Sequence, residues 1–248
     1  MIELLKGDCL QLMKDIPSGS VDAIITDPPY GTTACKWDSV IDFKLMWEQL
    51  NRIIKPNGAI VLFGSEPFSS ALRMSNIKNY KYDWVWIKNR ASGAMNAKKQ
   101  PMRASESIMV FYQKQCEYNP IMTERTEKEL QRLSNKSVTT SSSNNYNKHW
   151  SKTANRNDNK LKYPNNIINI KTVFNRSKDK VEHPTQKPVP LMEYLIKTYT
   201  NENETVLDFT MGSGTTMVAC QNTNRNGIGI EQDDKYFEIA KQRTGIVD

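Results

Sequence analysis

With 248 residues and a formal net charge of +7, the chain is long enough for one large α/β domain with an inserted region and can bury a core without disulfide bonds. Its four cysteines are widely spaced, form no CxxC pair and are joined by only two histidines, so we expect no metal site. The first residues do not resemble a signal peptide and no apolar stretch reaches membrane-spanning length, which predicts a soluble cytoplasmic protein with no membrane partner.

The N-terminal part of the chain alternates between strand and helix patterns. Residues 2–5 predict a short strand, and the Lys-Gly-Asp turn after them leads into a helix that ends near Met13. The apolar, β-branched run at 21–26 predicts a buried strand, which the following DPPY motif must end because proline offers no N–H to a strand ladder. The motif consists of Asp27, Pro28, Pro29 and Tyr30.

The DPPY motif groups a carboxylate, fixed carbonyls and an aromatic ring at the carboxyl end of a strand. Ligands of open α/β sheets bind at that edge. Asp27 and the Pro28 carbonyl can accept hydrogen bonds from an exocyclic amine, while the Tyr30 ring can stack on a heterocycle. We therefore assign the catalytic role to this motif, acting on a flat substrate that bears an amine. The alternative is an ordinary proline-rich turn.

The patterns that follow predict half of a doubly wound sheet. An apolar helix face runs from 45 to 54 and is expected to end in the KPNG sequence at 55–58. Residues 59–63 predict a buried strand, and Pro67 can start the next helix.

The middle of the chain is basic. Between Lys88 and Lys180, 19 Lys and Arg stand against 7 Asp and Glu, whereas the rest holds 15 basic and 20 acidic residues. Clustered cations neutralise phosphates, which favours a polyanion-binding insert; the alternative is a solvated, lysine-rich loop. Aromatic-rich strands are expected at 81–87, with Tyr82, Trp84 and Trp86 in the core, and at 107–112. They are followed by a mobile loop at 134–160 and β character at 165–174.

The C-terminal part has the order of elements that a nucleotide-type cofactor site requires. Residues 205–209 predict a buried strand, a glycine turn follows at 210–216, and an amphipathic helix comes after it. Gly212 and Gly214 permit a close approach of backbone to ligand, and the next strand ends in Glu231, whose carboxylate can bind both hydroxyls of a ribose.

The glycine turn lacks the third glycine of the dinucleotide fingerprint, because Thr216 or Met217 stands in its place. This departure disfavours a pyrophosphate-bearing dinucleotide and favours S-adenosylmethionine. A dinucleotide-dependent oxidoreductase would explain the glycine turn but not DPPY. A non-catalytic DNA-binding module would explain the basic region but has no use for two ligand sites at strand ends.

Several motifs together resemble one family. DPPY at 27–30 is similar to the motif of amino-methyltransferases that act on adenine N6 or cytosine N4 in DNA, and residues 208–216 resemble the methyltransferase cofactor loop. HPTQKP at 183–188 and LKGD at 5–8 resemble further segments of that family. The order, with DPPY first, the basic region next and the cofactor loop last, resembles the β group of DNA amino-methyltransferases.

This resemblance implies a Rossmann-like methyltransferase fold, doubly wound with a mostly parallel sheet, and S-adenosyl-L-methionine as the cofactor. His183 would otherwise be read as a loop residue, and Asp8 as a helix N-cap. The cofactor-binding residues it implies are Asp8, Cys9, Asp27, His183, Pro184, Thr185, Lys187, Asp208, Phe209, Thr210, Met211, Gly212, Ser213, Gly214, Thr215, Thr216, Glu231 and Gln232.

The implied activity is methylation of adenine N6 in a specific double-stranded DNA sequence by base flipping. Aspartate at the first DPPY position resembles the adenine enzymes, whereas cytosine N4 enzymes more often carry serine there. Cytosine N4 methylation of DNA stays the first alternative, and methylation of RNA or of a protein amide the second. The residues expected to contact DNA are Lys88, Arg90, Lys98, Lys99 and Arg103.

Three functional parts follow from these assignments. Residues 1–87 form the catalytic half, 88–180 a basic target-recognition insert whose strand near 107–112 belongs to the core sheet, and 181–248 the cofactor-binding half. The resemblance also raises a homodimer and a cognate restriction endonuclease as partners besides DNA.

Overall fold

The computed structural model describes residues 1–32, 38–134, 160–174 and 180–246. They form two compact units, Met1–Asn119 with Asn166–Asp248, and Pro120–Asn165. The predicted functional division at 87 and 180 stays a prediction, and almost all of the loop expected at 134–160 lies outside the described residues. No helix in these described ranges is long and apolar enough to cross a membrane.

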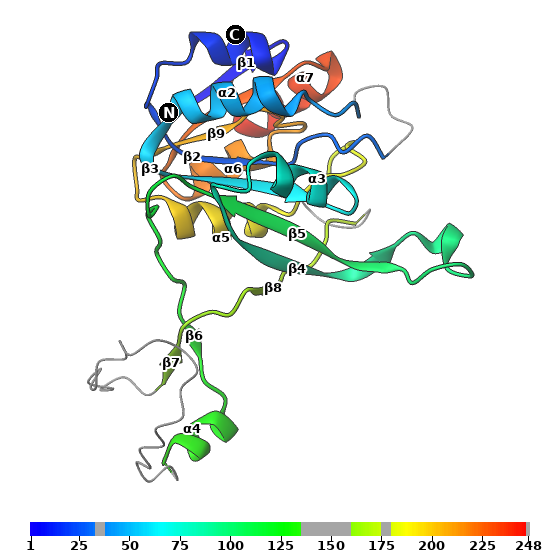
Figure 1. The fold of residues 1–248 in the computed structure, drawn as a ribbon, viewed down its shortest axis with the longest axis vertical. Helices are drawn as coiled ribbons and strands as arrows, with labels where there is room; N and C mark the ends of the chain where they lie inside the picture. The colour runs from blue at the N-terminus through cyan, green and yellow to red at the C-terminus, as the bar shows by residue number, and fades with distance from the viewer. Residues whose placement is uncertain (33–37, 135–159, 175–179, 247–248) are drawn as a thin grey trace. The chain divides into compact units, whose positions relative to one another are not determined.

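The larger unit is built on one eight-stranded sheet in the order β1-β10-β9-β2-β3-β5-β4-β8 (Figure 1). Its strands run parallel except for β3–β5 and β5–β4, so the predicted doubly wound, mostly parallel sheet is confirmed. The strands are β1 Ile2–Lys6, β2 Val21–Thr26, β3 Ile54–Gly64, β4 Tyr80–Ser92, β5 Arg103–Phe111, β8 Ile167–Asn169, β9 Thr205–Asp208 and β10 Asn226–Glu231.

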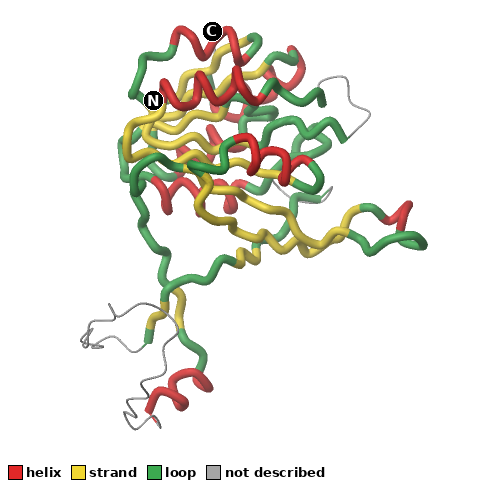
Figure 2. The backbone as a smooth tube through the Cα atoms, in the orientation of Figure 1, coloured by secondary structure: helices red, strands yellow, loops and turns green. Residues whose placement is uncertain are grey.

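Helices cover both faces of this sheet (Figure 2). On one face lie α1 Cys9–Leu12, α2 Phe43–Ile53 and α3 Phe68–Ser75, and on the other α5 Val189–Tyr199, α6 Thr215–Asn222 and α7 Asp234–Thr244. The packing of strand β2 explains its consecutive apolar residues: Ala23 and Ile25 pack toward α5, whereas Ile24 packs toward α2. A parallel strand buried on both faces cannot alternate with polar residues.

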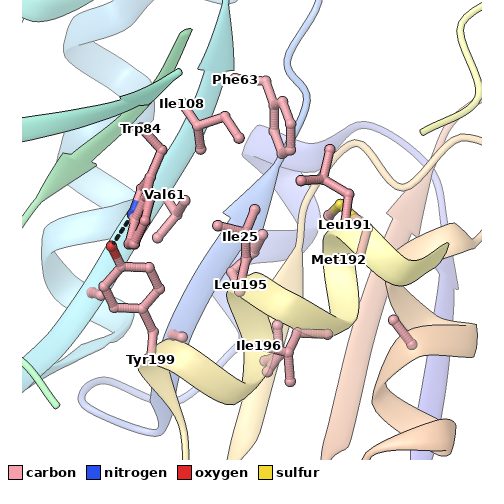
Figure 3. Packing of buried hydrophobic residues seen from close by; sticks show 14 of the residues in the cluster. Ile25, Val61, Phe63, Trp84, Ile108, Leu191, Met192, Leu195, Ile196 and Tyr199 are labelled. Atoms are coloured by element: carbon pink, nitrogen blue, oxygen red, sulfur yellow. Dashed lines mark hydrogen bonds between the residues drawn. The ribbon is translucent and has the colours of Figure 1, made fainter. Parts of the chain in front are cut away.

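The core beneath α5 holds two of the three aromatic residues predicted to be buried, Trp84 and Trp86, and Tyr82 packs half-buried against it (Figure 3). Trp84 and Trp86 of β4 are buried, and the Trp84 indole Nε1 donates a hydrogen bond of 2.6 Å to the Tyr199 hydroxyl. The partner oxygen allows the polar edge of the indole to be buried without loss of hydrogen bonding.

The β character expected at 165–174 is confirmed for Ile167–Asn169, which form β8. Two expectations for individual elements are wrong. The KPNG sequence does not close α2; the helix ends at Ile53 and the chain enters β3 at once, with residues 55–58 inside the strand. Helix α6 is not amphipathic, because the sheet, α5 and α7 surround it and most of its side chains are buried.

Strands β4 and β5 continue beyond the sheet as a two-stranded ribbon (Figures 1 and 2). The pairing extends to Ser92 opposite Arg103, and a short 3-10 helix, Ala94–Asn96, lies at the turn. Nearly all ribbon residues from 89 to 105 are exposed.

The smaller unit contains an antiparallel pair, β6 Thr123–Glu124 with β7 Leu161–Lys162, and the helix α4 Glu127–Ser134. Thr126 and Glu129 form a capping box: the Glu129 carboxylate accepts the Thr126 N–H at 2.8 Å and the Thr126 hydroxyl accepts the Glu129 N–H at 3.3 Å. Lys162 pairs with Glu129 at 2.7 Å and so ties β7 to α4.

Candidate active site

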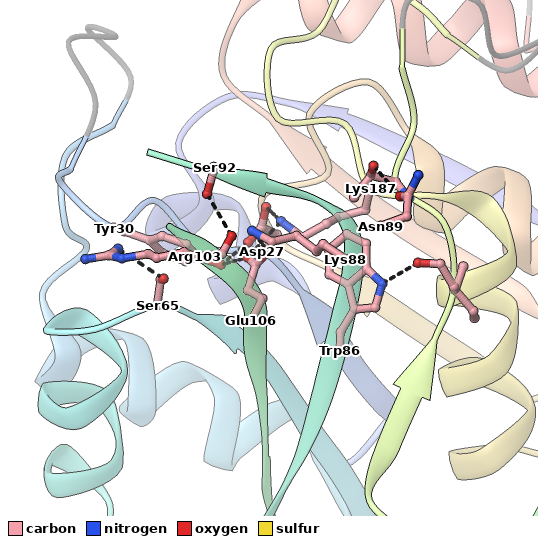
Figure 4. Close-up of polar contacts among 12 residues, drawn as sticks. Asp27, Tyr30, Ser65, Trp86, Lys88, Asn89, Ser92, Arg103, Glu106 and Lys187 are labelled. Atoms are coloured by element: carbon pink, nitrogen blue, oxygen red, sulfur yellow. Dashed lines mark hydrogen bonds and ion pairs between the residues drawn. The ribbon is translucent and has the colours of Figure 1, made fainter. Parts of the chain in front are cut away.

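The carboxyl ends of β2 and β9 open onto one cavity of about 660 Å³. These strands are parallel neighbours, with Ala23 opposite Val206, so the DPPY motif and the glycine turn leave the sheet at the same edge. The HPTQKP segment at 183–188 and the base of the β4–β5 ribbon complete the wall (Figure 4). This is the topological switch point at which open α/β sheets bind ligands.

Nearly all residues singled out from the sequence line this cavity. They are Asp8, Cys9, Asp27, Pro28, Pro29, Tyr30, Lys88, Arg90, Arg103, His183, Pro184, Thr185, Lys187, Asp208, Phe209, Thr210, Met211, Gly212, Ser213, Thr215, Thr216, Glu231 and Gln232.

Gly214, Lys98 and Lys99 are not part of the wall. Gly214 is the N-cap of α6 with φ of 75°, and a Cβ atom there would meet the Cβ of Ala240 at 2.8 Å. Glycine at position 214 therefore permits the positive φ of the turn and the close packing of α6 against α7. Lys98 and Lys99 are exposed near the end of the ribbon.

A half-buried polar network surrounds Asp27 (Figure 4). The Lys187 ammonium donates to Asp27 Oδ2 and lies 3.4 Å from Glu106 Oε1. The Tyr30 hydroxyl lies 2.5 Å from Asp27 Oδ1 and 2.9 Å from Glu106 Oε1, and it donates to one carboxylate at a time because it has one proton. Lys88 Nζ lies 3.7 Å from Glu106 Oε2, so two lysines balance two carboxylates.

Burial and charge act in opposite directions on this network. Burial raises the pKa of Asp27 above its ordinary value, although the neighbouring Lys187 ammonium lowers it. Burial lowers the pKa of Lys187, but the carboxylates of Asp27 and Glu106 outweigh that effect and raise it above its ordinary value. Lys187 is therefore an ammonium at neutral pH.

The Tyr30 ring was expected to stack on a substrate ring. One of its faces is taken by Phe68, with ring centroids 4.9 Å apart and planes inclined by 29°. Its hydroxyl is bound to the network of Asp27 and Glu106, and both burial and those carboxylates raise its pKa, so the phenol stays neutral. The ring is thus fixed in orientation before any substrate arrives.

Asp208 joins the two halves of the site. Its carboxylate accepts hydrogen bonds from the hydroxyls of Thr26 and Thr216 and from the N–H of Thr210 at 3.2 Å. The Thr210 hydroxyl donates in turn to the backbone carbonyl of Asp27 at 3.2 Å. Burial raises the pKa of Asp208 to about 6. With its oxygens occupied by protein donors, Asp208 acts as the link between β9 and the end of β2.

Glu231, at the end of β10, presents its carboxylate to the cavity. Oε2 accepts the N–H of Gly212 at 2.9 Å and Oε1 accepts the N–H of Asp233 at 2.7 Å. Each oxygen retains a further lone pair, so the group is oriented and can still accept from a ligand hydroxyl. Burial raises the pKa of Glu231.

His183 lies against the glycine turn. Gly212 has φ of 52°, and a Cβ atom there would come within 2.8 Å of His183 Nε2. The His183 ring packs edge-on against Tyr236, with centroids 4.4 Å apart. Burial, assisted by the positive charge of Lys187, lowers the pKa of His183 to about 4, so the cavity holds a neutral imidazole at neutral pH.

Asp8 and Cys9 form the wall at the start of α1. Asp8 Oδ1 accepts the N–H of Gln11 at 3.0 Å, so it caps the helix as well as lining the cavity. Burial raises the pKa of the Cys9 thiol to about 12, which leaves a neutral, unreactive side chain.

Comparison with known proteins assigns the chain to a family. The family model described as DNA methylase, which covers N6 and N4 methyltransferases, matches residues 21–242. The chain belongs to the N6/N4 DNA methylase family. Membership confirms the predicted DNA amino-methyltransferase and excludes both the oxidoreductase and the non-catalytic DNA-binding module.

Relatives of this DNA methylase match almost its whole length. The Type II methyltransferase M.HpaI of Haemophilus parainfluenzae is 29% identical over 253 residues, which cover 97% of this chain and 73% of that protein. The DNA adenine methyltransferase YhdJ of Escherichia coli K12 is 27% identical over 260 residues, 98% of this chain and 82% of that protein.

Solved structures agree with the fold. The M1.HpyAVI–SAM complex superposes with a TM-score of 0.68 and 30% identity, covering 99% of this chain and 100% of that one. The cytosine-N4-specific PvuII DNA methyltransferase reaches a TM-score of 0.67 at 15% identity, a likeness of fold alone.

Sequence reasoning missed two residues of this methylase site. Glu106, on β5, is a carboxylate within the basic region and close to Asp27. It is the only acidic residue between positions 88 and 116 of the sequence, and this isolation was the signal that could have found it. Arg243, in the last turn of α7, donates to the Ser213 carbonyl at 2.7 Å and to the Thr215 hydroxyl at 2.9 Å, and so holds the glycine turn.

Proposed function

We propose that this DNA methylase transfers a methyl group from S-adenosylmethionine to the exocyclic N6 amine of adenine, within a specific sequence of double-stranded DNA. The observation that carries the proposal is the convergence of DPPY and the glycine turn, from the neighbouring strands β2 and β9, on one cavity. Two relatives support the proposal: YhdJ is a DNA adenine methyltransferase, and the structure of M1.HpyAVI is a complex with SAM.

The residues of the glycine-turn side fit the cofactor. Glu231 is an oriented carboxylate with acceptor capacity left, as a ribose diol requires, and Gly212 brings backbone close to the cavity without a side chain. The neutral imidazole of His183 adds no positive charge that would repel a sulfonium. When bound, S-adenosylmethionine supplies a methyl group activated by its positively charged sulfur.

The DPPY side would prepare the amine. The exocyclic nitrogen is a weak nucleophile because its lone pair is delocalised into the ring. Acceptance of its N–H bonds by the Asp27 carboxylate and the Pro28 carbonyl favours a pyramidal nitrogen and stabilises the positive charge that develops on it. The two prolines fix the backbone that carries these acceptors, so little reorganisation is needed at the moment of reaction. The fixed ring of Tyr30 would contact the target base.

An amine inside a duplex cannot reach this cavity, so the target base would be flipped out at a cost of a few kcal/mol. The ribbon is suited to supply compensating contacts. Arg90 and Arg103 lie where the ribbon meets the cavity, and Lys98 and Lys99 are exposed further along it. A two-stranded ribbon fits the major groove, and its cations neutralise phosphates. Lys88, by contrast, faces Glu106.

The choice of adenine depends on Asp27 as the first DPPY residue. Cytosine N4 is the alternative base, and RNA or a protein amide the alternative substrate. The cytoplasmic location, the homodimer and the cognate endonuclease expected from the sequence belong to the same proposal; Type II relatives such as M.HpaI are its support.

Product identification tests the proposal. Unmethylated phage λ DNA is incubated with the purified chain and S-adenosylmethionine that carries a trideuterated methyl group, then digested to nucleosides for mass spectrometry. We expect deuterated N6-methyldeoxyadenosine, and nanopore sequencing of the same DNA would give its sequence context. Deuterated N4-methyldeoxycytidine instead, or label found only in added RNA or protein, would refute the adenine proposal in favour of the corresponding alternative.

A further inference from the structure

The position on Asp27 that the proposed function gives to the target amine is held by Lys187. Its ammonium donates to Asp27 Oδ2, while the other carboxylate oxygen faces the Tyr30 hydroxyl (Figure 4). Both groups are sequestered, since the Lys187 side chain is 10% exposed and that of Asp27 23%. The amine of a substrate base and the ammonium are both N–H donors, so they compete for the same acceptor.

During methyl transfer, electrostatic repulsion between the Lys187 ammonium and the target nitrogen adds to this competition. The target nitrogen gains positive charge as it attacks, and Asp27 stabilises that charge. An ammonium left on the same carboxylate would repel the developing charge, because both positive charges would lie beside one carboxylate group. Lys187 must therefore leave Asp27 before or during the reaction.

Glu106 offers Lys187 a second carboxylate within reach. Its Oε1 lies 3.4 Å from Lys187 Nζ, and its side chain is 10% exposed. The Phe63 ring lies 5.0 Å from the same nitrogen and covers it, so a small movement of the head group keeps the ammonium both paired and shielded. The Tyr30 hydroxyl, between the two carboxylates, can give its hydrogen bond to whichever acid Lys187 leaves.

We propose that Glu106 is a positioning residue for methyl transfer: it receives the Lys187 ammonium when the target amine takes its place on Asp27. Before the base arrives, the hydrogen bond from Lys187 holds the Asp27 carboxylate in its orientation. After the transfer to Glu106, Asp27 is free to accept from the amine. This inference rests on the proposed function.

Single-turnover methylation separates this role from a merely structural one. Enzyme in saturating excess over a duplex with one target site, found as described above, is mixed with labelled S-adenosylmethionine. Glu106→Gln removes the receiving charge and should slow the turnover at least tenfold, with cofactor affinity by calorimetry within threefold of wild type. Adding Lys187→Gln to that variant removes the competing positive charge, and the double variant should turn over at least threefold faster than Glu106→Gln alone.

The matched control is Glu238→Gln on α7, which removes one carboxylate from a 3.7 Å pair with Lys241 and does not touch the cavity; it should keep the wild-type rate. Equal rates for Glu106→Gln and wild type, or a double variant no faster than Glu106→Gln, would overturn the inference. If Glu106→Gln shows no cooperative melting, Glu106→Asp replaces it. This variant keeps the carboxylate but places it one methylene farther from Lys187, so we expect a smaller slowing that Lys187→Gln again relieves, and no slowing would overturn the inference.

Failure of the inference and failure of the proposed function give different results. A wild-type chain that labels no DNA refutes the proposed function. A wild-type chain that labels adenine while Glu106→Gln keeps its rate refutes only the role of Glu106.

Discussion

Glu231→Gln tests the cofactor side of the site with almost no change of shape. Each carboxylate oxygen accepts one backbone N–H, from Gly212 at 2.9 Å and from Asp233 at 2.7 Å. A glutamine amide has one acceptor oxygen and one NH₂ donor, so in either orientation one backbone N–H faces another donor. The substitution therefore breaks one charge-assisted hydrogen bond and weakens the other.

The magnitude follows from these contacts. Hydrogen bonds to a charged group contribute roughly 1.5–3 kcal/mol each. Because burial raises the pKa of Glu231, relief of its desolvation offsets part of the loss, and we expect the free energy of unfolding to fall by about 1–2 kcal/mol. A ribose diol that loses its charged acceptor should lose roughly 1.5–3 kcal/mol of binding, a weakening of about ten- to a hundredfold in Kd.

Isothermal titration calorimetry with S-adenosylmethionine measures the change in Kd. Denaturant unfolding measures the change in the free energy of unfolding. Asp234→Asn is the matched control: it removes one negative charge three residues away, from a side chain that is 97% exposed and paired with Lys6 on the surface. Its Kd should equal that of wild type. A Glu231→Gln variant that binds the cofactor within twofold of this control would refute the assignment of Glu231 to the ribose.

Three further substitutions address other parts of the site. Asp27→Ala should abolish methyl transfer to DNA while cofactor affinity by calorimetry stays within about threefold of wild type, since the change lies on the acceptor side; retained methylation would contradict the mechanism. Gly212→Ala should lower stability by about 1–2 kcal/mol for its left-handed φ of 52°, and weaken cofactor binding because its Cβ displaces the His183 ring; calorimetry and thermal melting measure both. Burial raises the pKa of Asp208 to about 6, so this group stabilises the fold below about pH 4 and loses that contribution as the pH rises through 6. Asp208→Asn should therefore show a smaller decrease in melting temperature than wild type between pH 4.5 and 7, and parallel curves would contradict the assignment.

Local pattern was sufficient to predict the strands that carry the site. The run at Val21–Thr26 has apolar residues at the consecutive positions 23–25, which indicates a strand buried on both faces, and the prolines after it fix where the strand ends. The glycine turn was recognisable for a similar reason, since Gly212 and Gly214 both have positive φ.

Tertiary packing decided what local pattern could not. The KPNG sequence has the composition of a helix-ending turn, yet Gly58 lies inside β3. A Cβ atom there would meet the Asp22 carbonyl at 2.7 Å and the Ile54 side chain at 2.6 Å. The glycine thus permits a close approach of β3 to β2, where the register between Val21 and Ala23 shifts. A glycine such as Gly58 can indicate either a turn or a place where two strands pack closely. Only the pairing of β3 with β2 shows which of the two applies here.

The role of Lys187 could likewise not be predicted from local sequence. Its motif implied cofactor binding, whereas its ammonium pairs with Asp27, a residue 160 positions earlier in the chain. That pairing exists because the segment at 183–188 returns across the edge where β2 and β9 lie side by side. No window of sequence contains both partners, and the third member, Glu106, arrives on an antiparallel strand from the basic region.

The hydrogen bonds between β2 and β9 indicate which part of the site can move. Thr26 and Thr216 both donate to Asp208, and Thr210 donates to the Asp27 carbonyl, so buried bonds fix the backbone of DPPY relative to the glycine turn. Acceptor and cofactor sites are thereby held in one geometry before either ligand binds, which is the preorganisation that methyl transfer needs. When the target amine replaces the Lys187 ammonium on Asp27, the Lys187 side chain must therefore move while the backbone of DPPY and of the glycine turn stays in place.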